Sequence, residues 1–200
     1  MTQPVRNDPR RATWADLLAL PEHQKGEIVN GELVVAPRPA TPHVMVASDL
    51  AVLLGGTFRF GSGGGPGGWV ILAEPGIVFG DDLRAPDLAG WRTARWPRTQ
   101  VRGPFEVVPD WVCEVLSPRT RRTDRVEKMP LYATHGVSHA WLIEPEARTL
   151  EVYRREGVQW LQLGVYSSGE VRAEPFDAVP LSLDAVFSLL PPLDEAAQDE

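Results

Sequence analysis

Hydrophobic residues near the start of the chain recur first with the period of a helix and then with the period of a strand. The segment "TWADLLAL" predicts a short helix with Thr13 as its N-cap. The segment "GEIVNGELVV" alternates on both sides of Asn30-Gly31, and an Asn-Gly pair favours a two-residue turn. The two segments therefore predict a helix followed by a β-hairpin.

The next apolar segment, residues 41–55, has the spacing of a longer helix. We place Thr41 at its N-cap, Pro42 in its first turn and Gly55 at its end. The residues expected on its buried face are Val44, Ala47, Leu50, Ala51 and Leu54. The glycine-rich run "GGTFRFGSGGGPGG" at its end is interpreted as a loop, because no Gly-Lys-Ser or Gly-Lys-Thr of a phosphate-binding loop follows it.

Apolar and β-branched runs predict strands over most of the remaining chain. The central three are residues 69–79, 83–91 and 110–116. Residues 119–136 predict a basic turn followed by a helix that Pro130 should bend. Four further strands and a closing helix, with Ser182 as its cap, are expected in the segments "SHAWLIEP", "TLEVYRRE", "QWLQLGVYS", "VRAEPF" and "SLDAVFSLL".

The order of these elements predicts an α+β or mixed α/β fold in which helices flank one sheet. A chain of 200 residues fits a single domain of this kind. We place the domain at residues 13–190. It lies between two segments with the composition of disordered ends, residues 1–12 and the acidic tail 191–200.

Composition limits where this protein is expected to work. The sequence has neither a run of about 18 apolar residues nor an apolar signal segment, so we expect no membrane span and no export. A single cysteine excludes an internal disulfide and fits a reducing cytoplasm. We therefore expect a cytoplasmic protein.

Charge is distributed unevenly along the chain. The net charge of −7 argues against general affinity for nucleic acid, yet residues 84–128 hold ten cations and six anions, an excess of +4. A local basic surface can bind phosphate groups even on an acidic protein. Eight arginines of this region are candidates for nucleic-acid binding: Arg92, Arg95, Arg98, Arg102, Arg119, Arg121, Arg122 and Arg125.

One carboxylate stands inside the apolar run "PDWVCEVLSP", residues 109–118. Burying Glu114 costs several kcal/mol unless its charge is paired, hydrogen-bonded or bound to a metal ion. Side chains alternate along a strand, so Cys113 points away from Glu114 and is expected to be a small buried hydrophobic residue.

A second acid, Asp87, lies on the preceding predicted strand, and it converges on Glu114 if the two strands pair. Two close carboxylates repel each other unless a proton or a cation lies between them. Oxygen ligands suit a hard ion such as Mg²⁺ or Mn²⁺, and the Val115 backbone carbonyl can supply a third ligand. The pair therefore predicts a divalent metal site.

Lys128 follows the Glu114 strand and is one of two lysines among twenty cations. A lysine where arginine is the rule indicates that a compact point charge is needed. The alternative is a surface pair with Asp124, four residues earlier on the predicted helix. The sequence leaves both interpretations of Lys128 open.

Five segments give the chain a resemblance to a known family: "GEIVNGEL", "PRPATPH", "APDLAGW", "VCEVLSPRTRRTDRVEKMPLYATHGVSHAWLIEP" and "TLEVYR". In this order they resemble the Uma-type restriction endonucleases, a bacterial branch of the PD-(D/E)XK nuclease superfamily. The resemblance runs from Trp14 to Phe187. It implies a restriction-endonuclease-like core, with a central mixed sheet flanked by helices and with an N-terminal hairpin and C-terminal strands added.

The resemblance also implies roles for individual residues. Pro86-Asp87 is similar to the "PD" element of the superfamily, and Glu114 is similar to the acid of its second element. The usual lysine would fall at Leu116, and Lys128 matches a lysine moved to the next helix. Further site candidates implied by the resemblance are Glu27, Glu74 and His43.

The chemistry implied by the resemblance is hydrolysis of phosphodiester bonds in nucleic acid, with DNA as the expected substrate. Asp87, Glu114 and the Val115 carbonyl would hold Mg²⁺ or Mn²⁺, with Glu74 as an additional ligand. Lys128 would position the attacking water or stabilise the transition state. A homodimer would supply one site for each strand of a duplex. Two tryptophans, Trp91 and Trp96, are candidates for base stacking, although burial is their commoner role.

Two other interpretations stay open. The chain can be a catalytically weak module on a nuclease scaffold that binds nucleic acid or a partner, which the net charge and Leu116 favour. In the third interpretation Glu114 is structural and is paired with Arg84 or Arg119.

Overall fold

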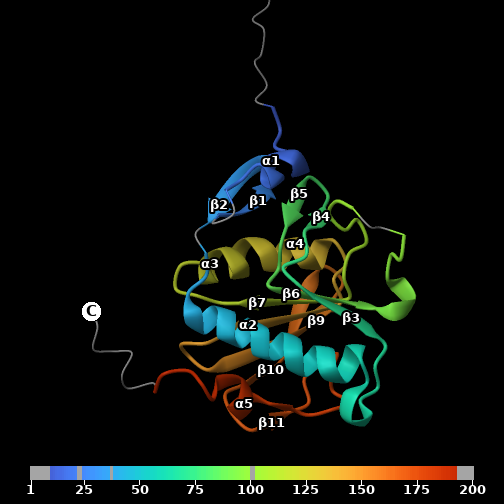
Figure 1. Cartoon of the computed structure of the whole chain (residues 1–200), viewed down its shortest axis with the longest axis vertical. Helices are drawn as coiled ribbons and strands as arrows, with labels where there is room; N and C mark the ends of the chain where they lie inside the picture. Colours follow the sequence, from blue (N-terminus) through green and yellow to red (C-terminus); the bar gives the residue numbers. More distant parts are fainter. Residues whose placement is uncertain (1–9, 22–23, 37, 100–101, 193–200) are drawn as a thin grey trace, which may run out of the picture.

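A six-stranded mixed sheet forms the centre of the computed structural model, which describes residues 10–21, 24–36, 38–99 and 102–192 (Figure 1). The strand order is β10-β9-β8-β7-β6-β3, and among these strands only β7 and β8 run parallel. A parallel pair needs a crossover connection, which is helical here. The strands are β3 (Trp69–Ala73), β6 (Leu88–Arg92), β7 (Trp111–Val115), β8 (His139–Glu144), β9 (Thr149–Glu156) and β10 (Gln159–Tyr166).

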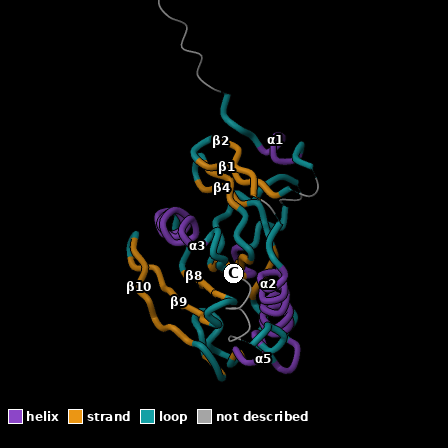
Figure 2. Tube along the Cα trace, turned by 90° about the vertical axis from the view of Figure 1, so that its left-hand side faces the viewer, coloured by secondary structure: helices purple, strands orange, loops and turns teal. Residues whose placement is uncertain are grey.

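Helices cover both faces of this sheet, as Figure 2 shows for α2 and α3. On one face pack α2 (Thr41–Leu54) and α5 (Leu183–Phe187). The crossover from β7 to β8 covers the other face and consists of α3 (Arg121–Thr123), a π-helical turn (Asp124–Lys128) and α4 (Met129–Thr134). A mixed central sheet flanked by helices confirms the predicted fold class.

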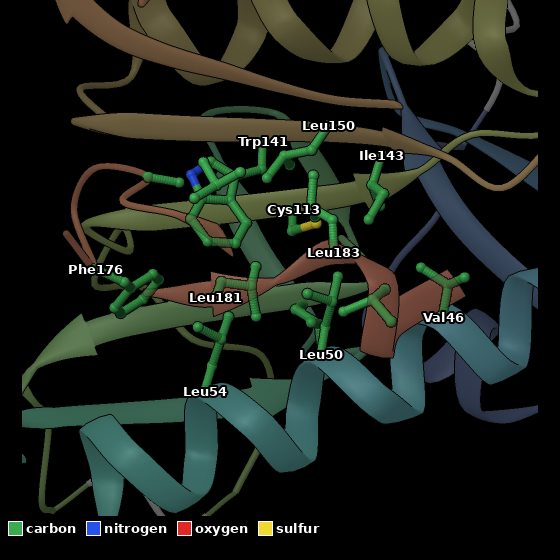
Figure 3. Close-up of a cluster of buried hydrophobic side chains, with 14 of the residues drawn as sticks. Val46, Leu50, Leu54, Cys113, Trp141, Ile143, Leu150, Phe176, Leu181 and Leu183 are labelled. Atoms are coloured by element: carbon green, nitrogen blue, oxygen red, sulfur yellow. The ribbon is translucent and has the colours of Figure 1, made fainter. Parts of the chain in front are cut away.

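The alternation of side chains along β7 divides them between two hydrophobic cores. Cys113 faces the core under α2 and belongs to the same cluster as Leu50 (Figure 3). Val112 faces the opposite core and packs in the same cluster as Tyr132 of α4. As predicted, Cys113 is fully buried and lies on the face of β7 opposite to Glu114.

A second, antiparallel sheet lies in the upper part of Figure 1. Its order is β2-β1-β5-β4, with β1 (Lys25–Val29), β2 (Glu32–Ala36), β4 (Ile77–Phe79) and β5 (Asp82–Arg84). The predicted hairpin is confirmed, because β1 and β2 pair around Asn30 and Gly31. These residues have φ values of 52° and 84°, as a two-residue hairpin turn requires.

The single strands predicted at 69–79 and 83–91 are wrong. Each is two strands that belong to different sheets, with breaks at 74–76 and 85–87. Each break contains a proline, which cannot donate a backbone hydrogen bond to a neighbouring strand. At each of these breaks the chain crosses between the two sheets, and the crossing at 85–87 ends at Asp87.

The helix α2 begins and packs differently from the prediction. Its N-cap is Ala40 rather than Thr41, and Val44 is 47% exposed. The buried residues form a row with a spacing of four: Val46, Leu50 and Leu54. Beyond them the chain does not leave the helix at once but continues as a π-helical turn (Gly55–Arg59), followed by a 3-10 turn (Ser62–Gly64).

Short elements complete the structure. The caps of α1 (Trp14–Leu18) and α5 are confirmed, since Thr13 forms a capping box and the Ser182 side chain accepts from Ala185 N at 3.2 Å. The strand predicted in "VRAEPF" is wrong, because only β11 (Glu170–Val171) pairs there, with β12 (Leu181–Ser182). The rest of that segment follows an irregular path that buries Phe176 in the core.

Pro130 distorts the helix that carries Lys128, as predicted. In the π-helical turn the N–H of Met129 bonds to the carbonyl of Asp124, five residues earlier. A regular helix would press the proline ring against the carbonyl four residues before it, and the wider turn relieves this contact. The distortion lies on the N-terminal side of the proline and contains both Asp124 and Lys128.

The terminal segments predicted to be disordered, 1–12 and 191–200, lie mostly outside the described residues and stay predictions. Within the described part of the chain, no helix is both long enough and apolar enough to span a bilayer.

We expect Gly90 of β6 to tolerate no side chain. An added Cβ would come within 3.1 Å of Trp111 and 3.3 Å of Trp69. Gly90→Ala should therefore lower the free energy of unfolding by about 1–3 kcal/mol, measured by denaturant titration. Gly55→Ala is the matched control. This residue has a helical φ of −63° and no described atom within 4 Å of its Cβ, so the change should stabilise by up to about 1 kcal/mol. Equal effects of the two substitutions would contradict this packing.

Candidate active site

Two acids meet at one edge of the central sheet. Asp87 directly precedes β6, and Glu114 lies near the end of β7. The strand register pairs Leu88 with Cys113, so Asp87 and Glu114 stand opposite each other. In addition, the Val115 N–H donates to Asp87 Oδ2 at 2.7 Å. The two acids singled out by the sequence are therefore brought together.

The backbone carbonyl of Val115 faces the same side as its N–H. The N–H and C=O of one residue in a regular strand point to the same neighbouring strand, here β6. Continuing the register by two residues places Pro86 opposite Val115. A proline has no N–H to donate to that carbonyl. The order Pro-Asp thus leaves a carbonyl that β6 does not use beside the Asp87 carboxylate.

The second oxygen of Asp87 contacts His43, which lies in the first turn of α2. His43 Nε2 is 3.0 Å from Asp87 Oδ1. Because an ionised carboxylate only accepts hydrogen bonds, His43 carries its proton on Nε2 in this contact. The structure therefore brings His43, a weaker candidate from the sequence, into the site.

Glu114 is buried, with 2% of its surface exposed, and the crossover helix supplies its partners. Oε1 accepts a hydrogen bond from the Tyr132 hydroxyl at 2.5 Å, and Oε2 lies 3.1 Å from Lys128 Nζ. The cation that contacts Glu114 is thus Lys128, and not Arg84 or Arg119 as the third interpretation of the sequence required.

Lys128 is surrounded by three carboxylates. Its Nζ lies 3.1 Å from Glu114, 3.2 Å from Asp124 and 3.5 Å from Glu27. Asp124 is itself buried, with 2% exposure. The interpretation of Asp124 and Lys128 as a surface helix pair is therefore wrong, and both residues belong to the site.

Glu27 reaches the site from β1 of the smaller sheet. Its Oε1 accepts from the Ala85 N–H at 2.9 Å, and its Oε2 lies 3.4 Å from Arg84 Nη1. The buried Arg84 also binds Asp82 Oδ2 at 2.8 Å. Through these bonds Glu27 ties the smaller sheet to the acids of the central sheet.

The site holds more negative charge than its cations balance. Among the described residues five carboxylates gather around two cations: Glu27, Asp82, Asp87, Glu114 and Asp124 around Arg84 and Lys128. Burial, together with the neighbouring acids, raises the pKa of Glu114 well above its ordinary value despite Lys128. Burial also raises the pKa of Asp124.

Burial and the negative charge of the same carboxylates shift the pKa values of Lys128 and Tyr132. Burial alone would lower the pKa of Lys128, but the surrounding acids, Glu114 foremost, raise it well above its ordinary value. Burial and then Glu114 raise the pKa of the Tyr132 phenol, which therefore stays protonated and donates. All these shifts retain protons, as expected of a site that lacks positive charge.

An oxygen-rich, negatively charged site of this kind fits a hard divalent cation. Within the described residues no three His, Cys, Asp or Glu side chains are grouped closely enough to hold an ion. Two carboxylates and the Val115 carbonyl are the donors that the geometry offers. Glu74 is not among them, since its N–H donates to the Asp87 carbonyl at 3.0 Å but its carboxylate pairs with Lys25.

The eight candidate arginines do not form one surface around the acids. Arg92 and Arg95 lie at the end of β6 away from Asp87. There the Arg92 guanidinium stacks 4.2 Å from the Trp69 ring, and Arg95 binds Asp110 at 2.5 Å. These two arginines are therefore used within the protein and far along the strand from the acids.

The remaining six arginines differ in their partners. Arg121 contacts Glu144 at 3.4 Å, and Arg125 forms two hydrogen bonds with Glu151. Exposed positions beyond these are Arg98, Arg102, Arg119 and Arg122. Of these, Arg119 and Arg122 lie in the segment between β7 and the π-helical turn, which leaves β7 at the end that carries Glu114.

Base stacking on Trp91 is wrong, because its side chain is fully buried. Its ring packs against Trp96 and Phe105, and its Nε1 donates to the Val107 carbonyl at 2.8 Å. Trp96 belongs to the same aromatic cluster and is half-buried. The tryptophans thus stabilise the loop after β6.

Sequence reasoning missed Tyr132 and the role of Arg84. A signal for the first was present, since Asp124, Lys128 and Tyr132 follow one another at intervals of four and so share a helix face. No local signal links Arg84 to Glu27, because this contact depends on the pairing of β1 with β5.

Comparisons with known proteins show the family of this chain. A model of the Uma2 family, described as "Putative restriction endonuclease", matches residues 14–186, and the chain therefore belongs to this family. A crystal structure described as "a putative nuclease belonging to DUF820 from Anabaena variabilis" is 26% identical and covers 88% of this chain and 98% of its own, with a TM-score of 0.70. No curated protein matches the chain. Family and neighbour together support a nuclease that acts on nucleic acid, in a family that generally uses divalent metals.

We expect Glu114→Gln to separate a metal site from a structural ion pair. The substitution keeps the shape and removes one surplus negative charge, while Lys128 keeps Asp124 and Glu27. In EDTA the variant should therefore melt at or above the temperature of the wild type. With Mn²⁺ the order should reverse, because the wild type gains about 1.4 kcal/mol at a tenfold excess over Kd, or roughly 2–4 °C.

The opposite result has a clear meaning. A variant that melts lower in EDTA, together with a wild type that does not respond to Mn²⁺, would show that Glu114 serves the fold and binds no ion.

Proposed function

We propose that this protein is a metal-dependent endonuclease that hydrolyses phosphodiester bonds of DNA. The observation that carries the proposal is that Lys128 lies 3.1 Å from Glu114 at the strand ends, where Glu114 and Asp87 stand opposite each other. Membership of the Uma2 family supports the same reaction class.

In this proposal Asp87, Glu114 and the Val115 carbonyl bind Mg²⁺ or Mn²⁺. When bound, such an ion lowers the pKa of a water ligand and neutralises charge that develops on the phosphate oxygens. Tyr132 holds Glu114 through Oε1, whereas Asp87 is held through both oxygens, Oδ1 by His43 and Oδ2 by the Val115 N–H. The protein thereby presents both carboxylates in defined orientations.

Lys128 supplies the positive charge of the reaction centre. Its raised pKa keeps it an ammonium ion at neutral pH. An ammonium group can orient the attacking water and stabilise the negative charge of the transition state. Glu27 and Asp124 hold it near the reacting atoms, and Leu116 leaves the usual position of the superfamily lysine without a charge.

The substrate backbone would be bound mainly from the turn after β7. Arg119 and Arg122 are exposed there, and this segment follows the end of β7 that carries Glu114. Cutting both strands of a duplex requires two sites, and we therefore expect a homodimer to form on DNA. These arginines would contact the phosphates of the DNA backbone, and this binding would not depend on the base sequence.

Lys128→Ala tests the catalytic assignment. The variant should bind metal and DNA no more weakly than the wild type, whereas cleavage should fall by a factor of about 10² or more, because the ammonium acts mainly in the transition state. Single-turnover cleavage of plasmid DNA by protein free of host nuclease measures this. Thr134→Ala, an exposed change at the end of α4, serves as control.

Equal cleavage by both proteins would remove Lys128 from the reaction. DNA binding by a wild type that does not cleave with Mg²⁺ or Mn²⁺ would instead favour the binding module on a nuclease scaffold.

A salt titration tests the assignment of the binding surface. Affinity for duplex DNA should fall steeply with salt, and the double change Arg119→Ala and Arg122→Ala should reduce the slope of log K against log salt by about two. Arg92→Ala with Arg95→Ala is the matched control, because those arginines are used at the far end of β6. If the control variant reduced the salt slope as much as the test variant, the DNA would bind at the opposite ends of the strands, near Arg92 and Arg95.

A further inference from the structure

Lys128 has two buried acceptors at almost the same distance. Its Nζ lies 3.1 Å from Glu114 of β7 and 3.2 Å from Asp124 of the π-helical turn. Each acid is held independently of the lysine, Glu114 by Tyr132 and Asp124 by the side chain of Thr120. The ammonium group therefore lies between two fixed carboxylates that belong to different elements.

Whenever Glu114 is ionised, its buried charge requires a cation. Glu114 is buried in the strand, and among the described side chains Lys128 is the cation that contacts it. A divalent ion bound by Asp87 and Glu114 would neutralise the same carboxylate and repel the ammonium. Asp124 belongs to the same helical turn as Lys128, lies 3.2 Å from its Nζ and can keep the ammonium without Glu114.

We propose that Lys128 is the resident counter-ion of Glu114, which a divalent cation displaces, and that Asp124 is the positioning residue that retains the ammonium after the exchange. The inference rests on the proposed function. In this inference Asp124 acts only through Lys128 and contacts neither the substrate nor the metal ion. It also explains why the π-helical turn places two buried, oppositely charged residues side by side.

The exchange has a consequence for the reaction. Before the ion binds, the ammonium of Lys128 donates a hydrogen bond to Glu114 and forms ion pairs with Asp124 and Glu27. An ammonium group has three protons, so release from Glu114 leaves one free to donate to a water or a phosphate oxygen. Cation binding would thus prepare the lysine for its catalytic contact.

Mn²⁺ binding without nucleic acid tests the proposal, with free Mn²⁺ measured by electron paramagnetic resonance. Lys128→Gln removes the competing cation and should lower the Kd for Mn²⁺ by about tenfold or more. Asp124→Asn removes the alternative acceptor, leaves Lys128 on Glu114 and should raise the Kd several-fold. Glu127→Gln, an exposed acid on the same turn, is the matched control and should leave the Kd unchanged.

The double variant distinguishes positioning from a general effect of charge. If Asp124 acts by holding Lys128, Asp124→Asn should change the Kd much less in the Lys128→Gln background than in the wild type. An equal change in both backgrounds would mean that Asp124 acts only through its charge, and would overturn its positioning role.

The remaining outcomes are also decisive. A wild type that binds no Mn²⁺ would defeat the proposed metal site itself. A wild type that binds Mn²⁺ with a Kd equal to or lower than that of Lys128→Gln would overturn this inference alone. If Lys128→Gln does not fold in EDTA, its uncompensated acids predict that Mn²⁺ restores a cooperative thermal transition, and failure to restore it would overturn the exchange.

Discussion

The carboxyl group of Glu114 is buried, so its charge when ionised must be balanced inside the protein, and this constraint shapes much of the structure. β7 has a neighbour on either side and is covered on both faces, so water cannot solvate the carboxylate. The balancing groups must come from an element that packs over the strand. The crossover from β7 to its parallel neighbour β8 is such an element, and it carries Lys128 and Tyr132 onto the correct face. One connection therefore satisfies both the topology of the sheet and the charge at its centre.

Local patterns predicted the parts of the fold that depend on near neighbours. The turn at Asn30-Gly31, the cap at Ser182 and the opposite orientation of Cys113 and Glu114 follow from short-range rules. The breaks at 74–76 and 85–87 were missed, although each contains a proline. An apolar run shows that a strand is buried but not which of two sheets it joins, because pairing partners distant in the sequence decide this.

The candidate site likewise contains features that the sequence could predict and features that it could not. The convergence of Asp87 and Glu114 could be predicted, since it required only that two adjacent strands pair. The burial of Asp124 could not, because a charged pair four residues apart looks the same on a buried face as on an exposed one. The uses of Arg92 and Arg95 were equally hidden, because their partners Trp69 and Asp110 are brought near by the sheet register. Charge counted along a sequence does not show which cations are already paired.

The site is assembled from residues far apart along the chain, and this bears on how the protein is made. Glu27 bonds to a backbone group 58 residues later, and His43 bonds to Asp87 across 44 residues. Contacts of such separation form late in folding, because the intervening loops must first be closed. The crossover helix completes the arrangement only after β7 has formed. A nascent chain that ends at β7 therefore contains the acids Glu27, Asp87 and Glu114 but not yet Lys128 and Tyr132, which contact Glu114. The acids of the site therefore meet their lysine only once the crossover helix has been made and has packed over β7.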